Sequence, residues 1–145
     1  MPGILVGLDG SQYSERALEW AAKEAAIRHA PLRVLAVHTV ALGWSGQGVV
    51  YPEDAELVVR TKAAAQEQTD KVLAGIGGVR PDGVTVEAVN GIPADVLLRA
   101  SEDADMIVLG SRGSGGFARL RLGSVSDQVA RHAHCPVVII PHTDR

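Results

Sequence analysis

Five apolar runs rich in β-branched residues alternate along the chain with segments of helical periodicity. The runs cover residues 4–8, 32–40, 84–89, 106–110 and 136–140. The helical patterns cover residues 15–29, 52–76, 93–103 and 123–132. Strands that alternate with helices need right-handed crossovers and form a mainly parallel sheet. The pattern therefore predicts an α/β fold: one doubly wound, Rossmann-like sheet of five strands in the order 3-2-1-4-5, with helices on both faces.

The composition agrees with such a sheet. The chain has 145 residues, the size of one domain, so we predict a single domain over residues 1–145. Hydrophobic residues make up 46% of the chain and aromatic residues only 3%. The core must therefore consist of Ala, Val, Leu and Ile, which suit parallel strands packed between alanine-rich helices.

Charge and hydropathy argue against two classes of partner. The net charge is −3 and the Lys and Arg residues are scattered, which argues against a nucleic-acid-binding protein. No window approaches the apolar length that spans a bilayer, and the N-terminus lacks a signal-peptide pattern. We therefore expect a cytoplasmic protein with no membrane partner. Cys135 is the only cysteine, so no intrachain disulfide can form.

A glycine-rich loop follows the fourth apolar run. Gly110 and Gly113 are followed, after nine further residues, by Gly123-Ser124, where a helical pattern begins. Glycine lets a chain turn sharply and approach a ligand closely, and the N–H groups at a helix N-terminus attract anions. Ser124 is expected to cap that helix. The spacing therefore predicts a loop that holds the phosphates of a nucleotide.

Two better-known phosphate-binding motifs do not fit this loop. A Walker loop needs a Gly-Lys pair, which occurs nowhere in the chain. The dinucleotide fingerprint G-x-G-x-x-G should follow the first strand, where this chain has Gly7-Leu8-Asp9-Gly10-Ser11 instead. The loop therefore belongs to another type.

Three strand ends are expected to converge on one ligand site. Doubly wound sheets bind ligands at the carboxyl ends of their strands. This rule brings together residues 7–9, residues 38–40 and the loop at 110–113. The segment 41–51 leaves the same edge without a clear period, and both a mobile lid and a variable surface connection remain open for it.

These features together resemble the universal stress protein family, in its nucleotide-binding branch. Its motif, G-x-x-G followed by nine residues and G-[ST], is matched in full by Gly110, Gly113, Gly123 and Ser124. The similarity extends to residues 4–11, 37–38, 91–93 and 134–137, and so covers essentially the whole chain. It implies an adenine nucleotide α-hydrolase-like fold and an ATP-binding regulator of the stress response.

The resemblance also implies the positions of an ATP site, with Mg²⁺ accompanying the nucleotide. In the family, the loop backbone and the serine hydroxyl hold the phosphates, the first-strand aspartate lies near the nucleoside, and the end of the second strand contacts adenine. Carried over, the site residues are Gly7, Asp9, Thr39, Gly110, Ser111, Arg112, Gly113, Ser114, Gly123, Ser124 and Val125. Asp9 can accept hydrogen bonds from ribose hydroxyls, or it can cap the turn through Gly10-Ser11.

The last apolar run carries no charge. An exposed apolar edge strand is normally covered or paired. Family members usually dimerise through this strand, so the resemblance implies a homodimer built by antiparallel pairing of residues 137–140.

Enzymatic and metal-binding alternatives fit the sequence less well. An adenylating enzyme of the related superfamily needs a Ser-Gly-Gly-x-Asp-Ser loop or a His-Ile-Gly-His signature, and the chain has neither. A receiver domain needs clustered acids at strand ends, where Asp9 stands alone. We expect no catalytic residues and no efficient turnover, while slow ATP hydrolysis remains open. No metal site is expected from His132, His134, Cys135 and His142, which need not share a face.

Overall fold

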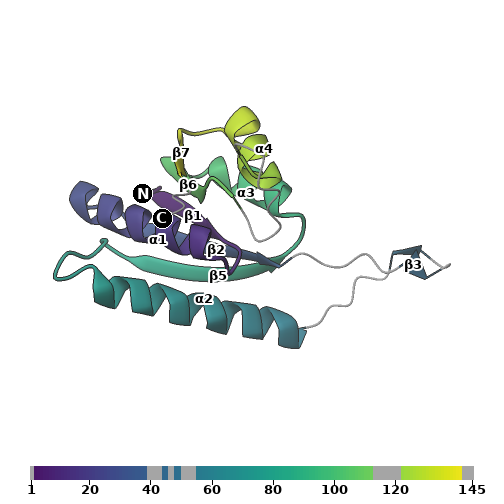
Figure 1. Ribbon diagram of the computed structural model, residues 1–145, viewed down its shortest axis with the longest axis horizontal. Helices are drawn as coiled ribbons and strands as arrows, with labels where there is room; N and C mark the ends of the chain where they lie inside the picture. The colour runs from purple at the N-terminus through teal and green to yellow at the C-terminus, as the bar shows by residue number, and fades with distance from the viewer. Residues whose placement is uncertain (1, 39–43, 46–47, 50–54, 113–121, 142–145) are drawn as a thin grey trace.

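The computed structural model describes residues 2–38, 44–45, 48–49, 55–112 and 122–141. Its main feature is a parallel sheet of five strands, which lies among the helices in Figure 1. Its strands are β1 (Ile4–Leu8), β2 (Leu32–His38), β5 (Val84–Asn90), β6 (Met106–Gly110) and β7 (Val137–Ile140). Their spatial order is β5-β2-β1-β6-β7, and every neighbouring pair is parallel. The order 3-2-1-4-5 predicted from the sequence is therefore confirmed.

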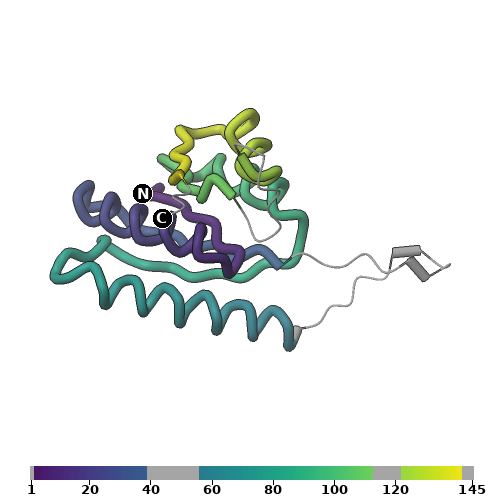
Figure 2. The backbone as a smooth tube through the Cα atoms, in the orientation of Figure 1, coloured from purple at the N-terminus to yellow at the C-terminus, as the bar shows by residue number. Residues whose placement is uncertain are grey.

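Four helices cover the two faces of the sheet. They are α1 (Gln12–Arg28), α2 (Ala55–Gly75), α3 (Pro93–Ser101) and α4 (Ser124–His132). The buried residues of α1 and α2 share one apolar cluster with the sheet, and those of α3 and α4 share a second cluster. The helices therefore form two layers with the sheet between them, and the backbone trace shows the same arrangement (Figure 2).

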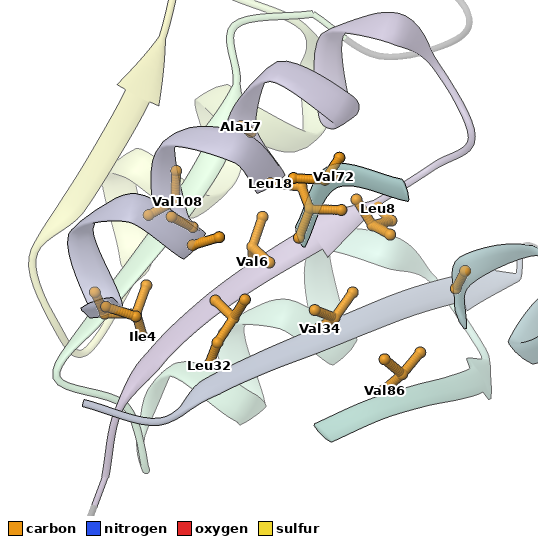
Figure 3. Close-up of a cluster of buried hydrophobic side chains, with 14 of the residues drawn as sticks. Ile4, Val6, Leu8, Ala17, Leu18, Leu32, Val34, Val72, Val86 and Val108 are labelled. Carbon is orange, nitrogen blue, oxygen red and sulfur yellow. The ribbon is translucent and has the colours of Figure 1, made fainter. Parts of the chain in front are cut away.

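Small side chains let α1 lie close to the sheet. Ala17, Ala21, Ala22 and Ala25 are fully buried on one face of the helix. They pack with alternate strand residues, among them Val6 (Figure 3). A core of aliphatic residues with few aromatic ones is what the composition predicts.

The ends of several elements differ from their predicted positions. The first helix begins at Gln12 instead of residue 15, because Ser11 acts as its N-cap. The third helix ends at Ser101 instead of residue 103. Strand β2 is described to His38, and residues 39 and 40 of the predicted run lie outside the described residues. Within the segment 41–51, for which a lid and a surface connection are both open, Trp44–Ser45 (β3) and Gly48–Val49 (β4) form an antiparallel pair, and the rest of the segment lies outside the described residues.

Candidate functional site

The turn after β1 fixes Asp9 at the carboxyl edge of the sheet. Its Oδ1 accepts a hydrogen bond from the backbone N of Ser11 at 2.9 Å, and a second one from the Ser11 hydroxyl. Gly10 has φ +83°, a left-handed conformation that glycine adopts without strain. The turn-capping role considered for Asp9 is therefore present in the structure, and it holds the exposed carboxylate at this edge.

The hydroxyls of Ser11 and Ser14 form hydrogen bonds with backbone groups at the start of α1. The Ser11 hydroxyl accepts from the backbone N of Ser14 at 3.2 Å, and the Ser14 hydroxyl donates to the Ser11 carbonyl at 2.9 Å. The backbone N of Asp9 in turn donates to the Ser14 hydroxyl at 3.4 Å. These bonds tie the end of β1 to the start of α1, so Asp9, Ser11 and Ser14 form one rigid corner.

Gly110 permits a close approach between β6 and α1. A Cβ built on Gly110 would lie 2.9 Å from the carbonyl oxygen of Tyr13 and 3.1 Å from its carbonyl carbon. Among the described glycines, positive φ angles occur at Gly10, Gly77 and Gly91 but not at Gly110. A side chain at Gly110 would therefore meet the backbone of α1, and the role of Gly110 in a phosphate loop stays a prediction.

Helix α4 starts directly beyond the end of β6. Gly123 is its N-cap, with φ −66° and ψ 162°, and this cap forms no side-chain hydrogen bond. The prediction that Ser124 caps the helix is wrong, because Ser124 is already the first helical residue and its side chain is exposed. Glycine at the cap contributes no side chain to the space in front of the first turn.

Backbone and hydroxyl bonds hold this N-terminus in place. The backbone N of Gly123 donates to the carbonyl of Ser111 at 2.7 Å, and the buried hydroxyl of Ser126 donates to the carbonyl of Gly110 at 2.6 Å. The backbone N of Ser111 donates to the carbonyl of Ile140 at 2.9 Å. Sequence reasoning missed Ser126; the pattern Ser-x-Ser at the start of a helix is the signal that points to it.

Gly7 lies inside the sheet instead of at its edge. It is buried, and a Cβ there would lie between 3.0 and 3.2 Å from the terminal methyl groups of Leu97 and Leu109. This position lets α3 pack closely on β1. Of the other predicted site residues, Ser111 is buried, Arg112 and Val125 are partly buried, and Thr39, Gly113 and Ser114 lie outside the described residues.

Of the residues weighed for a metal site, His132, His134 and Cys135 are described, and His142 lies outside the described residues. Nε2 of His134 lies 3.7 Å from Oε1 of the exposed Glu102. Burial raises the pKa of the Cys135 thiol, which keeps it protonated and makes it a poor metal ligand. Within the part of the chain that the structure describes, no three His, Cys, Asp or Glu side chains form a metal-binding group.

None of the described helices is both long enough and apolar enough to cross a bilayer.

The comparisons of the sequence and of the structure with known proteins point to the same family. Residues 2–141 match the model of the universal stress protein family. A universal stress protein of Mycobacterium tuberculosis is 39% identical over 155 residues, which cover 99% of this chain and 49% of that protein. The chain thus spans about half the length of the curated relatives it matches.

Two solved structures extend the comparison to three dimensions. The universal stress protein UspA from Lactobacillus plantarum has a TM-score of 0.80 and 25% identity, over 96% of this chain and 97% of that one. A universal stress protein from Archaeoglobus fulgidus in complex with dAMP has a TM-score of 0.60 and 29% identity, over 97% and 98% of the two chains.

Proposed function

The chain belongs to the universal stress protein family, and on this basis we propose that it binds ATP, with Mg²⁺, at the carboxyl edge of its sheet. We propose further that it acts in the cytoplasm as a nucleotide-dependent regulator of the stress response. The observation that carries the proposal is the start of α4 at Gly123, directly beyond β6 and without a side-chain cap. The complex of the Archaeoglobus fulgidus relative with dAMP supports an adenine nucleotide as the ligand.

The first turn of α4 suits a phosphate group. The backbone N of Gly123 is used by Ser111, and that of Asp127 bonds back to the carbonyl of Gly123. Helix geometry leaves the N–H groups of Ser124, Val125 and Ser126 without a partner inside the helix. Such groups, together with the helix dipole, favour an anion. The exposed hydroxyl of Ser124 can add a further donor.

Asp9 stands one strand away from this phosphate position and fits the sugar. The strand order places β1 next to β6, so the turn after β1 adjoins the end of β6. A carboxylate has two oxygens and about four acceptor positions, and the turn with Ser11 involves Oδ1. In the proposed complex, Asp9 accepts from the ribose hydroxyls while keeping its turn.

The proposed role is sensing instead of turnover. Asp9 is the acidic residue at the end of β1, and its carboxylate is already engaged by Ser11. In the proposed complex this carboxylate also accepts from the ribose, so it does not lie against the phosphates and is poorly placed to activate water for attack on them. Slow ATP hydrolysis is the alternative function, and phosphate release from Mg-ATP measures it directly.

We also propose a homodimer that pairs through β7. β7 is an edge strand that pairs only with β6 among the described strands, and it consists of the apolar residues Val137–Ile140. All four are partly exposed in the single chain. Antiparallel pairing with a second copy would cover this edge and satisfy its outward backbone groups.

Calorimetric titration with Mg-ATP tests the nucleotide site. Gly123→Val puts a branched side chain in front of the first turn of α4, and we expect it to abolish binding while the circular dichroism spectrum stays unchanged. Gly78→Val is the matched control, because a Cβ at Gly78 has no neighbour within 4 Å. Equal affinity of wild type and Gly123→Val would overturn the assignment of the phosphates to α4.

A further inference from the structure

Asn90, the last residue of β5, has a buried amide oxygen without a partner. Among the described residues, its Oδ1 is the one buried side-chain nitrogen or oxygen atom that forms no hydrogen bond. Buried polar atoms in folded proteins are almost always paired, and exceptions often mark functional positions. An amide oxygen accepts hydrogen bonds, so this atom calls for a donor that the described residues do not provide.

Asn90 lies at the same sheet edge as the proposed nucleotide site. It is in register with His38, the last residue of β2. The backbone N of Gly91 donates to the His38 carbonyl at 3.0 Å, so the two strand ends are tied together. Asn90 therefore holds a fixed position at the carboxyl ends of β2 and β5.

The strand order sets the distance from Asn90 to the proposed phosphates. Going outward from β6, the sheet continues through β1 and β2 to β5. Three strand spacings of about 4.8 Å separate β6 from β5, which gives about 14 Å. This matches the span of an extended nucleoside triphosphate. With the phosphates at α4 and the ribose at Asp9, the base reaches the ends of β2 and β5.

We propose that Oδ1 of Asn90 accepts a hydrogen bond from the exocyclic amine of adenine and makes the site prefer adenine to guanine nucleotides. The inference rests on the proposed ATP-binding function and adds a specificity-determining side chain to it. Guanine carries a carbonyl oxygen at the position of the adenine amine, so two acceptors would face each other. A site built around a hydrogen bond rejects a ligand that lacks the matching group.

Two substitutions at Asn90 separate the loss of the acceptor from other effects. Asn90→Leu has a similar shape and no acceptor, whereas Asn90→Asp keeps acceptor oxygens but cannot donate. Calorimetric titration with Mg-ATP and Mg-GTP gives the affinity ratio for each protein. Loss of one hydrogen bond should weaken ATP binding of Asn90→Leu by about tenfold, and loss of the oxygen that faces the guanine carbonyl should leave GTP binding equal or stronger. Asn90→Asp should keep the preference for ATP.

Thermal unfolding without nucleotide excludes a purely structural role. Asn90→Leu removes a buried unpaired oxygen, so its Tm should equal or exceed that of wild type. A structural role predicts a lower Tm instead. Gln66→Leu is the matched control: it removes an exposed amide of α2 that donates to Asp70 at 2.9 Å, so its Tm should fall slightly while its affinity ratio stays that of wild type.

The possible outcomes distinguish this inference from the proposed function. If wild type binds ATP and Asn90→Leu retains the same ratio of ATP to GTP affinity, the inference is wrong and the proposed function stands. If Asn90→Asp loses the preference as completely as Asn90→Leu, an acceptor role for the amide is likewise ruled out. If wild type binds neither nucleotide, the proposed function fails, and the inference fails with it.

Discussion

Gly110→Ala tests whether Gly110 serves packing between β6 and α1. The new methyl group would lie 2.9 Å from the carbonyl oxygen of Tyr13 and 3.2 Å from its Cβ. Backbone atoms cannot rotate away, so the first turn of α1 or the end of β6 must shift. Overpacking of this kind typically costs about 1–3 kcal/mol. For a chain of this size, that corresponds to a Tm lower by about 2–12 °C.

Urea unfolding monitored by circular dichroism, without nucleotide, measures this loss. Gly78→Ala is the matched control, because its Cβ would meet no atom within 4 Å, and its stability should stay at or slightly above that of wild type. If Gly110→Ala is as stable as Gly78→Ala, the close approach to Tyr13 is not what requires glycine at this position, and the reasoning is refuted.

Two further predictions concern the cap of α1 and the free edge of β7. Ser11→Ala removes the hydroxyl that accepts from the backbone N of Ser14, and it should lower the free energy of unfolding in urea by about 0.5–2 kcal/mol. Ser124→Ala should change the free energy of unfolding little, because Ser124 is not the N-cap of α4. Equal losses in the two variants would contradict this difference between the helix starts. The carbonyls of Pro136 and Ile140 accept from β6, so strand alternation turns the backbone N–H of Ile139 toward the free edge. Ile139→Pro should therefore give a folded monomer by light scattering, and a persisting dimer would count against pairing through β7.

Ile139→Pro is a better test than Val138→Glu because it introduces no charge, although Ile139 itself packs against the apolar cluster of α3 and α4. Val138 packs against the apolar cluster of α1 and α2, so a charge there would disturb the core as well as the edge. A monomer produced by Val138→Glu would not tell loss of pairing from loss of folding.

The sequence was informative about the fold because its signals are local and repeated. Apolar runs of strand length alternated with helical periods, and this order restricts a parallel sheet to few topologies. The start of the first helix is also visible in the sequence, where Ser11 and Ser14 are both candidate N-caps; the structure has Ser11 in this position. The end of β1 and both ends of β6 agree with the predicted ranges because those runs are continuously apolar.

The site was predicted less completely, because its side chains depend on contacts between distant segments. Nothing near Gly110 in the sequence reveals that Tyr13 fills the space beside it. Likewise, Gly7 owes its missing side chain to Leu97 on another element. Asn90 was not singled out at all, since an Asn at a strand end is common and its unpaired oxygen is visible only in three dimensions.

Thermal unfolding of the wild-type protein with and without Mg-ATP tests the central claim, nucleotide binding at the sheet edge, most directly. At about a hundred times its dissociation constant, a ligand adds about 2.7 kcal/mol of stability, which should raise the Tm by about 5–10 °C. Gly123→Val should show no such rise. An unchanged Tm of the wild type at millimolar Mg-ATP would contradict ATP binding by this chain.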